Sequence, residues 1–205
     1  PNIKRKFKTE DIYFVGSSHD PNIEAIKWFI EKVFDKLDNI KLHIIGQVCK
    51  QINNIRENIF LHHQLSEEEY IFTITNARLM ICPLISGAGV KGKIIEALSY
   101  KIPIISSEIG IHGTGVRDKE HVLVSELDPE FFAKCINENY NNLNLLNKIS
   151  ENGYNYFKEH HSYRSNINIV KNILEIPKSI EIEKIYNCLV TLVVYKDPNN
   201  IYEII

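Results

Sequence analysis

Six short apolar runs rich in β-branched residues recur along the first 125 residues, and they constrain the fold more than any other feature. Most of them are separated by stretches with helical spacing or by turn residues. The runs occupy residues 12–16, 42–46, 59–62, 79–82, 102–106 and 122–125. Strands that alternate with helices form parallel sheets with helices on both faces. The chain is therefore predicted to form a three-layer α/β/α domain around a mostly parallel six-stranded sheet.

The predicted helices begin and end at recognisable residues. Asp20 is predicted to cap the first helix, Pro21 suits its first turn, and an apolar stripe continues to Leu37. Pro177 cannot continue a helix, so a domain boundary is predicted near residues 176–179. Residues 1–176 then form one domain, and residues 177–205 form either an extension of it or the start of a following domain. Further helices are predicted at residues 66–75, 91–100, 128–140, 143–160 and 162–176.

Composition excludes several classes of partner. Lys and Arg number 24 against 26 Asp and Glu, so no charge excess favours nucleic acid or an anionic membrane surface. The four cysteines form no Cys-x-x-Cys pair, which favours reduced core thiols in an intracellular protein. The longest apolar run, residues 188–195, is too short for a spanning helix. We expect a cytoplasmic protein without an integral membrane segment or a nucleic-acid partner.

The densest chemical signal is the stretch of residues 83–99, which reads as a strand end, a glycine-rich loop and a helix start. Its glycines allow tight turns, and the first N–H groups of the helix carry partial positive charge, which suits a diphosphate. Lys93 adds a full positive charge, and Glu96 can accept hydrogen bonds from two ribose hydroxyls. The alternative is an exposed Lys93–Glu96 ion pair beside an ordinary turn.

Four segments in this order, residues 14–29, 42–46, 83–99 and 102–106, resemble the donor-binding half of family 4 glycosyltransferases (glycosyl transferases group 1). The resemblance covers residues 11–175. It implies the C-terminal, Rossmann-like half of a GT-B fold, which binds a UDP- or GDP-sugar at the C-terminal edge of its sheet and needs no metal or other cofactor. In that family the transfer retains the anomeric configuration.

The resemblance also implies roles for individual residues, while the catalytic residue stays unassigned. Asn22 is a further phosphate candidate, or merely solvates the helix start. His112 is a sugar-contact candidate, or lies in an exposed turn. The nucleobase is expected at His63, Gln64 and Leu65, and the ribose at Glu96. The diphosphate is expected at Gly16, Ser17, Gly87, Ala88, Gly89, Val90 and Lys93.

The family's acceptor site and usual catalytic histidine belong to an N-terminal domain that this chain is expected to lack. We therefore expect the fragment to bind donor but to transfer little, with that domain as its partner.

Three departures from the family pattern bear on function. Ala88 stands eight residues before Glu96, where many members carry a second glutamate that touches the sugar. The basic residues expected after the first strand are absent between Gly16 and Asn22, and Lys101 occupies a usual glycine position. A non-catalytic nucleotide-sugar-binding or scaffold module is therefore the alternative function. A dinucleotide-dependent oxidoreductase is disfavoured because the first strand is not followed by Gly-x-Gly-x-x-Gly.

Overall fold

The computed structural model describes residues 11–53, 56–162 and 164–167. The chain divides into two compact units, residues 1–158 and 159–205, and the whole sheet belongs to the first. The boundary predicted near residue 176, most of the helix predicted at 162–176 and the segment 177–205 lie outside the described residues. That part of the domain assignment stays a prediction.

All six strands pair in parallel in the order β3-β2-β1-β4-β5-β6, which confirms the predicted fold class. The last two strands are shorter than predicted, and the edge strand β6 keeps only two residues. The central strands are buried from both sides, as in Ile12, Tyr13 and Phe14. The strands are β1 (Asp11–Val15), β2 (Lys41–Ile45), β3 (Ile59–His62), β4 (Leu79–Cys82), β5 (Ile104–Ser106) and β6 (Leu123–Val124).

Helices connect the strands. All of those predicted within the described residues are present, and α6 has the predicted bounds. The sequence pattern did not predict η3 and α4, which are too short to show a helical period. The helical segments are α1 (Asp20–Trp28), the π-helix η1 (Phe29–Val33), the 3₁₀ segments η2 (Phe34–Lys36) and η3 (Gln47–Gln51), α2 (Glu67–Asn76), α3 (Gly92–Ser99), α4 (Glu108–Ile111), α5 (Pro129–Tyr140) and α6 (Leu143–His160).

The start of α1 differs from the prediction by one residue. His19 is the N-cap, without a side-chain hydrogen bond, and Asp20 is the first helical residue. Pro21 stands in the first turn, where its missing N–H costs nothing. In α2, by contrast, Ser66 and Glu69 form a full capping box.

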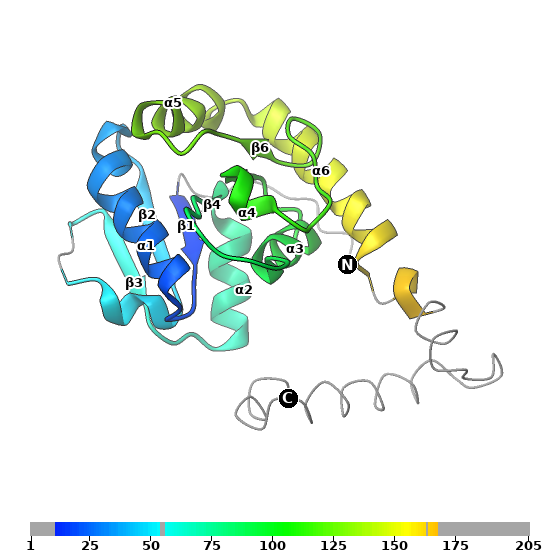
Figure 1. Cartoon of the computed structure of the whole chain (residues 1–205), viewed down its shortest axis with the longest axis horizontal. Helices are drawn as coiled ribbons and strands as arrows, with labels where there is room; N and C mark the ends of the chain where they lie inside the picture. Colours follow the sequence, from blue (N-terminus) through cyan, green and yellow to red (C-terminus); the bar gives the residue numbers. More distant parts are fainter. Residues whose placement is uncertain (1–10, 54–55, 163, 168–205) are drawn as a thin grey trace. The chain divides into compact units, whose positions relative to one another are not determined.

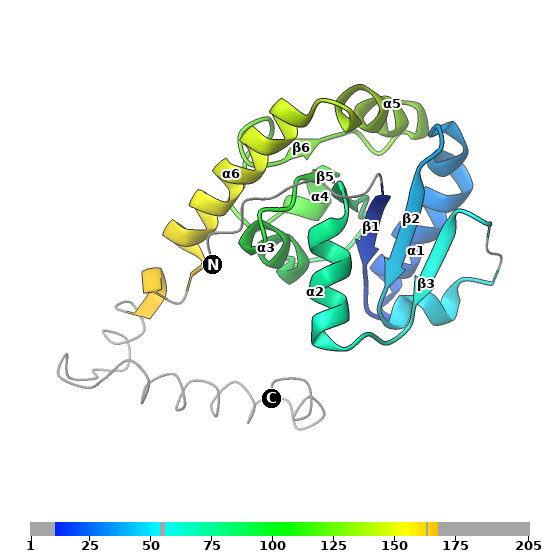
Figure 2. The same ribbon diagram turned by 180° about the vertical axis from the view of Figure 1, so that it is seen from behind.

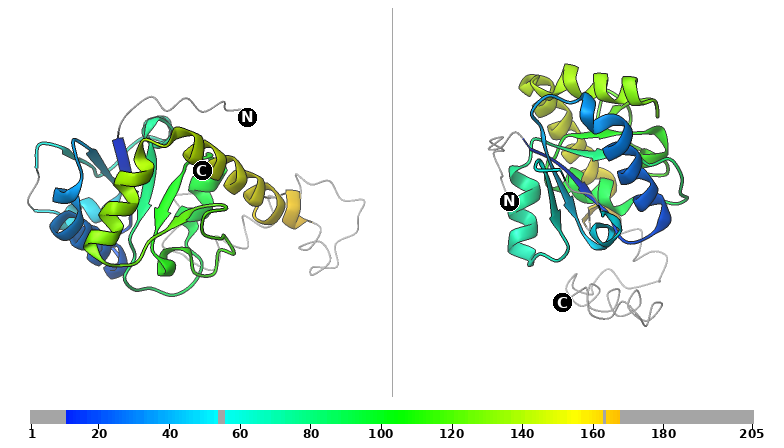
Figure 3. Two further views of the ribbon diagram at one scale, coloured as in Figure 1. Left: turned by 90° about the horizontal axis from the view of Figure 1, so that it is seen from above. Right: turned by 90° about the vertical axis from the view of Figure 1, so that its left-hand side faces the viewer.

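Helices cover both faces of the sheet. The opposite views of Figures 1 and 2 place α1 before one face and α2 before the other, and the right-hand view of Figure 3 shows the sheet between them. On the α1 face, α5 packs through the Phe132 ring, whose centroid lies 5.7 Å from that of Trp28 and 6.1 Å from that of Phe29. On the other face, the Tyr70 hydroxyl of α2 lies next to the Glu96 carboxyl group of α3.

The strand order creates one switch point. From β1 the chain continues to β2 on one side, whereas from β4 it continues to β5 on the other, although β1 and β4 are neighbours. In open α/β sheets the crevice at the carboxyl ends of two such strands is the usual place for a ligand. Here that edge carries the turn at 16–19 and the glycine-rich loop at 83–91.

Candidate functional site

Gly16 forms a tight turn directly after β1. A Cβ atom at this position would lie 2.9 Å from Phe14 Cε1 and 3.1 Å from Asn22 Cβ, so a larger residue would displace its neighbours. Asn22, in the first turns of α1, donates from Nδ2 to Ser17 Oγ at 3.0 Å. The predicted residues Gly16, Ser17 and Asn22 are therefore in direct contact, and Asn22 shapes the turn rather than merely solvating the helix start.

Lys93 reaches from α3 across the switch point. Its ammonium donates to Asn22 Oδ1 at 2.5 Å and to the Val15 carbonyl at 2.7 Å, and lies 4.7 Å from the centre of the Phe14 ring. An ammonium has three donors, and no described residue accepts from the third. Burial lowers the pKa of the Lys93 amino group. Lys93 thus places a positive charge, with one donor to spare, between β1 and β4.

The glycine-rich loop is exposed at this edge. Gly87 and Gly89 have φ angles of 116° and 74°, which residues with a side chain rarely adopt. A Cβ atom at Gly89 would meet nothing within 4 Å, so the outer side of the loop is open to a ligand. Lys91, to which the motif assigned no role, folds back over this loop and donates to the carbonyls of residues 87, 88 and 89.

Glu96 lies on the side of α3 that faces α2. Burial raises the pKa of its carboxyl group, while the hydrogen bond from Tyr70 opposes that rise. Burial and the nearby Glu96 charge in turn raise the pKa of the Tyr70 hydroxyl. The exposed Lys93–Glu96 ion pair therefore does not describe this site, because Lys93 bonds to β1 and α1 whereas Glu96 bonds to α2.

The predicted nucleobase segment lies between β3 and α2. His63 and Gln64 are exposed, whereas Leu65 is partly buried and packs on the core. Tyr70, which bonds to Glu96, stands in the first turns of the helix that this segment opens. The predicted base and ribose residues are therefore linked through α2.

The loop after α4 lies beside the glycine-rich loop. A Cβ atom at Gly113 would be 3.5 Å from Val90 Cγ2 and 3.6 Å from the Val90 nitrogen. His112 is exposed and ends α4. His112 thus stands in the sequence next to a residue that touches the predicted diphosphate loop.

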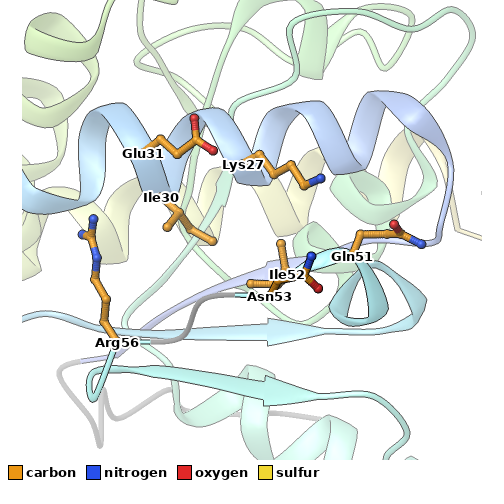
Figure 4. A pocket seen from close by; sticks show the side chains of 7 residues that line it. All are labelled: Lys27, Ile30, Glu31, Gln51, Ile52, Asn53 and Arg56. Atoms are coloured by element: carbon orange, nitrogen blue, oxygen red, sulfur yellow. The ribbon is translucent and has the colours of Figure 1, made fainter.

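A half-open pocket of about 340 Å³ lies elsewhere (Figure 4). None of the predicted site residues contributes to it, and the predicted site is an open sheet edge. The cavity is lined by Lys27, Ile30, Glu31, Gln51, Ile52, Asn53 and Arg56.

Among the described residues, no group of three or more His, Cys, Asp or Glu side chains is arranged to hold a metal ion. No helix in the described ranges is both long and apolar enough to cross a membrane.

The doubly wound parallel sheet, with a glycine-rich loop and a partly buried lysine at its switch point, defines a Rossmann-like domain of the GT-B glycosyltransferase type. The profile of the family described as Glycosyl transferases group 1 matches residues 9–142. The chain belongs to this family and corresponds to the C-terminal half of its fold.

Individual proteins of similar sequence or fold support this family assignment. An uncharacterized 44.6 kDa protein in the cps region of Klebsiella pneumoniae is 26% identical over 165 residues, which span 74% of this chain and 42% of that protein. The C-terminal domain of the glycosyl transferase group 1 protein LpcC from Francisella tularensis superimposes with a TM-score of 0.58 at 16% identity, over 74% of this chain and 86% of that domain. Anabaena HepE in complex with UDP and glucose gives a TM-score of 0.63 at 10% identity, over 82% and 49% of the two chains.

Proposed function

We propose that this domain binds the diphosphate of a UDP- or GDP-sugar at the switch point between β1 and β4 and supplies the donor half of a retaining glycosyltransferase. The observation that carries the proposal is the position of Lys93, whose ammonium joins α3 to the ends of β1 and α1. A fixed cation beside exposed backbone N–H groups is what a diphosphate requires. The UDP in the similarly folded HepE complex supports the choice of ligand class.

The ribose is assigned to Glu96. Its carboxylate faces the first turns of α2, which follow the predicted base segment 63–65. An ionised carboxylate has acceptor capacity beyond the single Tyr70 hydroxyl, so it can also receive hydrogen bonds from ribose. Base, ribose and diphosphate would then be bound by β3–α2, α3 and the glycine-rich loop. No metal or other cofactor has a part in this proposal.

The acceptor and the catalytic histidine are assigned to an N-terminal domain, so we expect this chain alone to bind donor without efficient transfer. The chain spans 42% of the length of the Klebsiella pneumoniae relative. The absence of a carboxylate at Ala88 keeps a nucleotide-sugar-binding module without transfer as the second candidate. We also expect the protein in the cytoplasm, which fractionation of the source cells would test.

A thermal-shift panel of UDP, GDP, ADP and their sugars tests the proposal. A ligand at 100 times its dissociation constant adds about 2.7 kcal/mol to the free energy of unfolding, which corresponds to a rise of several degrees in Tm. We expect UDP or GDP to raise Tm and uridine or guanosine to raise it much less. Equal shifts with nucleoside and nucleoside diphosphate would contradict a diphosphate site. An incubation with radiolabelled UDP-glucose, with and without the N-terminal domain of a related enzyme, separates binding from transfer.

A further inference from the structure

Lys91 is folded back on its own loop. Its ammonium donates to the carbonyl oxygens of Gly87, Ala88 and Gly89, at 3.4, 3.2 and 2.7 Å. A lysine side chain loses about 2 kcal/mol of rotamer entropy when it is fixed, so a surface lysine normally extends into water. Three acceptors of one loop within reach of one ammonium offset that cost.

This arrangement determines where the N–H groups of the loop lie. In a planar trans peptide the C=O bond and the following N–H bond point in opposite directions, and none of the described peptide bonds is cis. Carbonyls 87, 88 and 89 face the Lys91 ammonium, so the N–H groups of Ala88, Gly89 and Val90 lie on the far side of their peptide planes.

Those three N–H groups are available to a ligand. No hydrogen bond with any described residue occupies them. Ala88, Gly89 and Val90 are exposed, and the space beside Gly89 is open. Successive N–H groups that point outward from a turn form an anion-binding concavity.

We propose that Lys91 is a positioning residue of the donor site: it holds the carbonyls of residues 87–89 and thereby presents the N–H groups of residues 88–90 to the diphosphate. The inference rests on the proposed function. Lys91 and Lys93 then have different tasks, because Lys93 is anchored to β1 and α1 and supplies charge at the switch point. Lys91 shapes the loop before the ligand arrives.

The test compares Lys91→Met and Lys91→Arg with Lys148→Met, which removes an exposed lysine of α6. Backbone ¹⁵N order parameters are measured on the full chain without ligand. We expect values near the rigid limit of about 0.85 for residues 88–90 in the wild type and below about 0.6 in Lys91→Met. Lys148→Met should match the wild type, and Lys91→Arg should restore most of the order, because a guanidinium can also donate to carbonyls.

Calorimetric titration with UDP, and with GDP and ADP beside it, provides the second measurement. We expect Lys91→Met to weaken nucleoside diphosphate binding about tenfold or more, since the loop must then be ordered during binding. Lys148→Met should change it less than twofold.

Each outcome is decisive. Weaker UDP binding with unchanged order parameters would mean that Lys91 contacts the phosphate directly, and would overturn the positioning role. Unchanged order parameters with unchanged affinity would overturn it as well. If the wild type binds none of the three nucleotides, the proposed function fails, and the order parameters alone then decide whether Lys91 orders the loop.

Discussion

Asn22, near the start of α1, accepts a hydrogen bond of 2.5 Å from Lys93 of α3, although 71 residues separate them in the chain. The same amide group donates from its nitrogen to Ser17 Oγ. One side chain thus connects the turn after β1 to the helix after β4. The two halves of the switch point are held together before any ligand is present.

A double-mutant cycle with Asn22→Ala and Lys93→Met measures this connection. Hydrogen bonds to charged groups contribute about 1.5–3 kcal/mol, so each single variant should lower the free energy of unfolding in urea by an amount of this order. The double variant should lose clearly less than the sum, because both changes remove the same bond. Strict additivity would mean that the contact contributes nothing in solution.

The same variants test nucleotide binding. Lys93→Met should weaken binding of the nucleotide with the largest thermal shift by about ten- to hundredfold, because it removes a charged donor to the diphosphate. Asn22→Ala should weaken it less, since Lys93 keeps its bond to Val15. Calorimetry measures the dissociation constants of both variants. Wild-type affinity in Lys93→Met would mean that Lys93 does not take part in nucleotide binding.

Gly89→Val tests whether the loop backbone approaches a ligand. At a φ of 74° a β-branched residue is strained, although its Cβ atom meets no neighbour, so we expect about 1–2 kcal/mol of destabilisation and loss of nucleotide binding. Phe131→Ala, which shortens an exposed side chain of α5 outside the predicted site, is the control and should bind nucleotide like the wild type. Wild-type nucleotide binding by Gly89→Val would mean that the loop is an ordinary turn that no ligand approaches.

Glu96 should make nucleotide binding depend on pH. Burial raises the pKa of its carboxyl group, so the ionised form that accepts from ribose is lost at a higher pH than for an ordinary glutamate. We expect the affinity ratio of UDP to 2′-deoxy-UDP to fall as the pH decreases from 8 to 5; the ratio cancels the titration of the phosphates. The hydrogen bond from Tyr70 lowers the Glu96 pKa, so Tyr70→Phe should move this fall to higher pH. An affinity ratio that does not change with pH would contradict the ribose assignment. A ratio that falls at the same pH in Tyr70→Phe as in the wild type would contradict it as well.

The pair of His43 and His62 should make stability depend on pH. Their rings join β2 and β3 through Nδ1 of His43 and Nε2 of His62, 2.9 Å apart. Burial lowers the pKa of both imidazoles below 6.5; for His43, Lys41 acts in the same direction and Asp11 in the opposite one. The unfolded chain therefore takes up protons first as the pH falls.

Stability should accordingly be highest above about pH 6.5 and decline below it, because a histidine with a depressed native pKa favours unfolding once the unfolded form is protonated. Urea denaturation from pH 8 to 5 should show a shallower decline for His62→Asn than for the wild type. His19→Asn, which changes an exposed histidine, should follow the wild-type curve. Parallel curves for His62→Asn and the wild type would contradict the assignment.

The sheet, most helices and the glycine-rich loop could be predicted because their signals are local, whereas the role of the loop in binding a diphosphate stays a prediction. Alternating apolar runs indicated the strands, and the glycines before Lys93 indicated the loop. Lys101, which occupies a usual glycine position of the family, has a positive φ of 57°, and its ammonium lies 2.8 Å from the Glu151 carboxylate. The change of α1 into the π-helix η1 was not predictable, because nothing in a helical period distinguishes these geometries.

The contacts of the site were predictable only in part. The Tyr70 hydroxyl meets Glu96 because α2 and α3 share one face of the sheet, and His62 meets His43 through the register of β2 and β3. Neither contact could be predicted from the sequence, because the two residues of each pair come together only in the folded sheet. Lys91 is different: it lies within the motif, but its role depends on the unusual φ angles of the glycines around which it folds.

An NMR titration of the ¹⁵N-labelled chain with the nucleotide that gives the largest thermal shift shows where the ligand binds. We expect the largest amide shift changes on residues 16–17, 63–65 and 87–96, at the carboxyl edge of β1, β3 and β4. Amides of Lys27, Ile30 and Gln51, which line the cavity of Figure 4, should move little. Changes centred on that cavity, or no saturable change at the sheet edge, would contradict a donor site at the switch point.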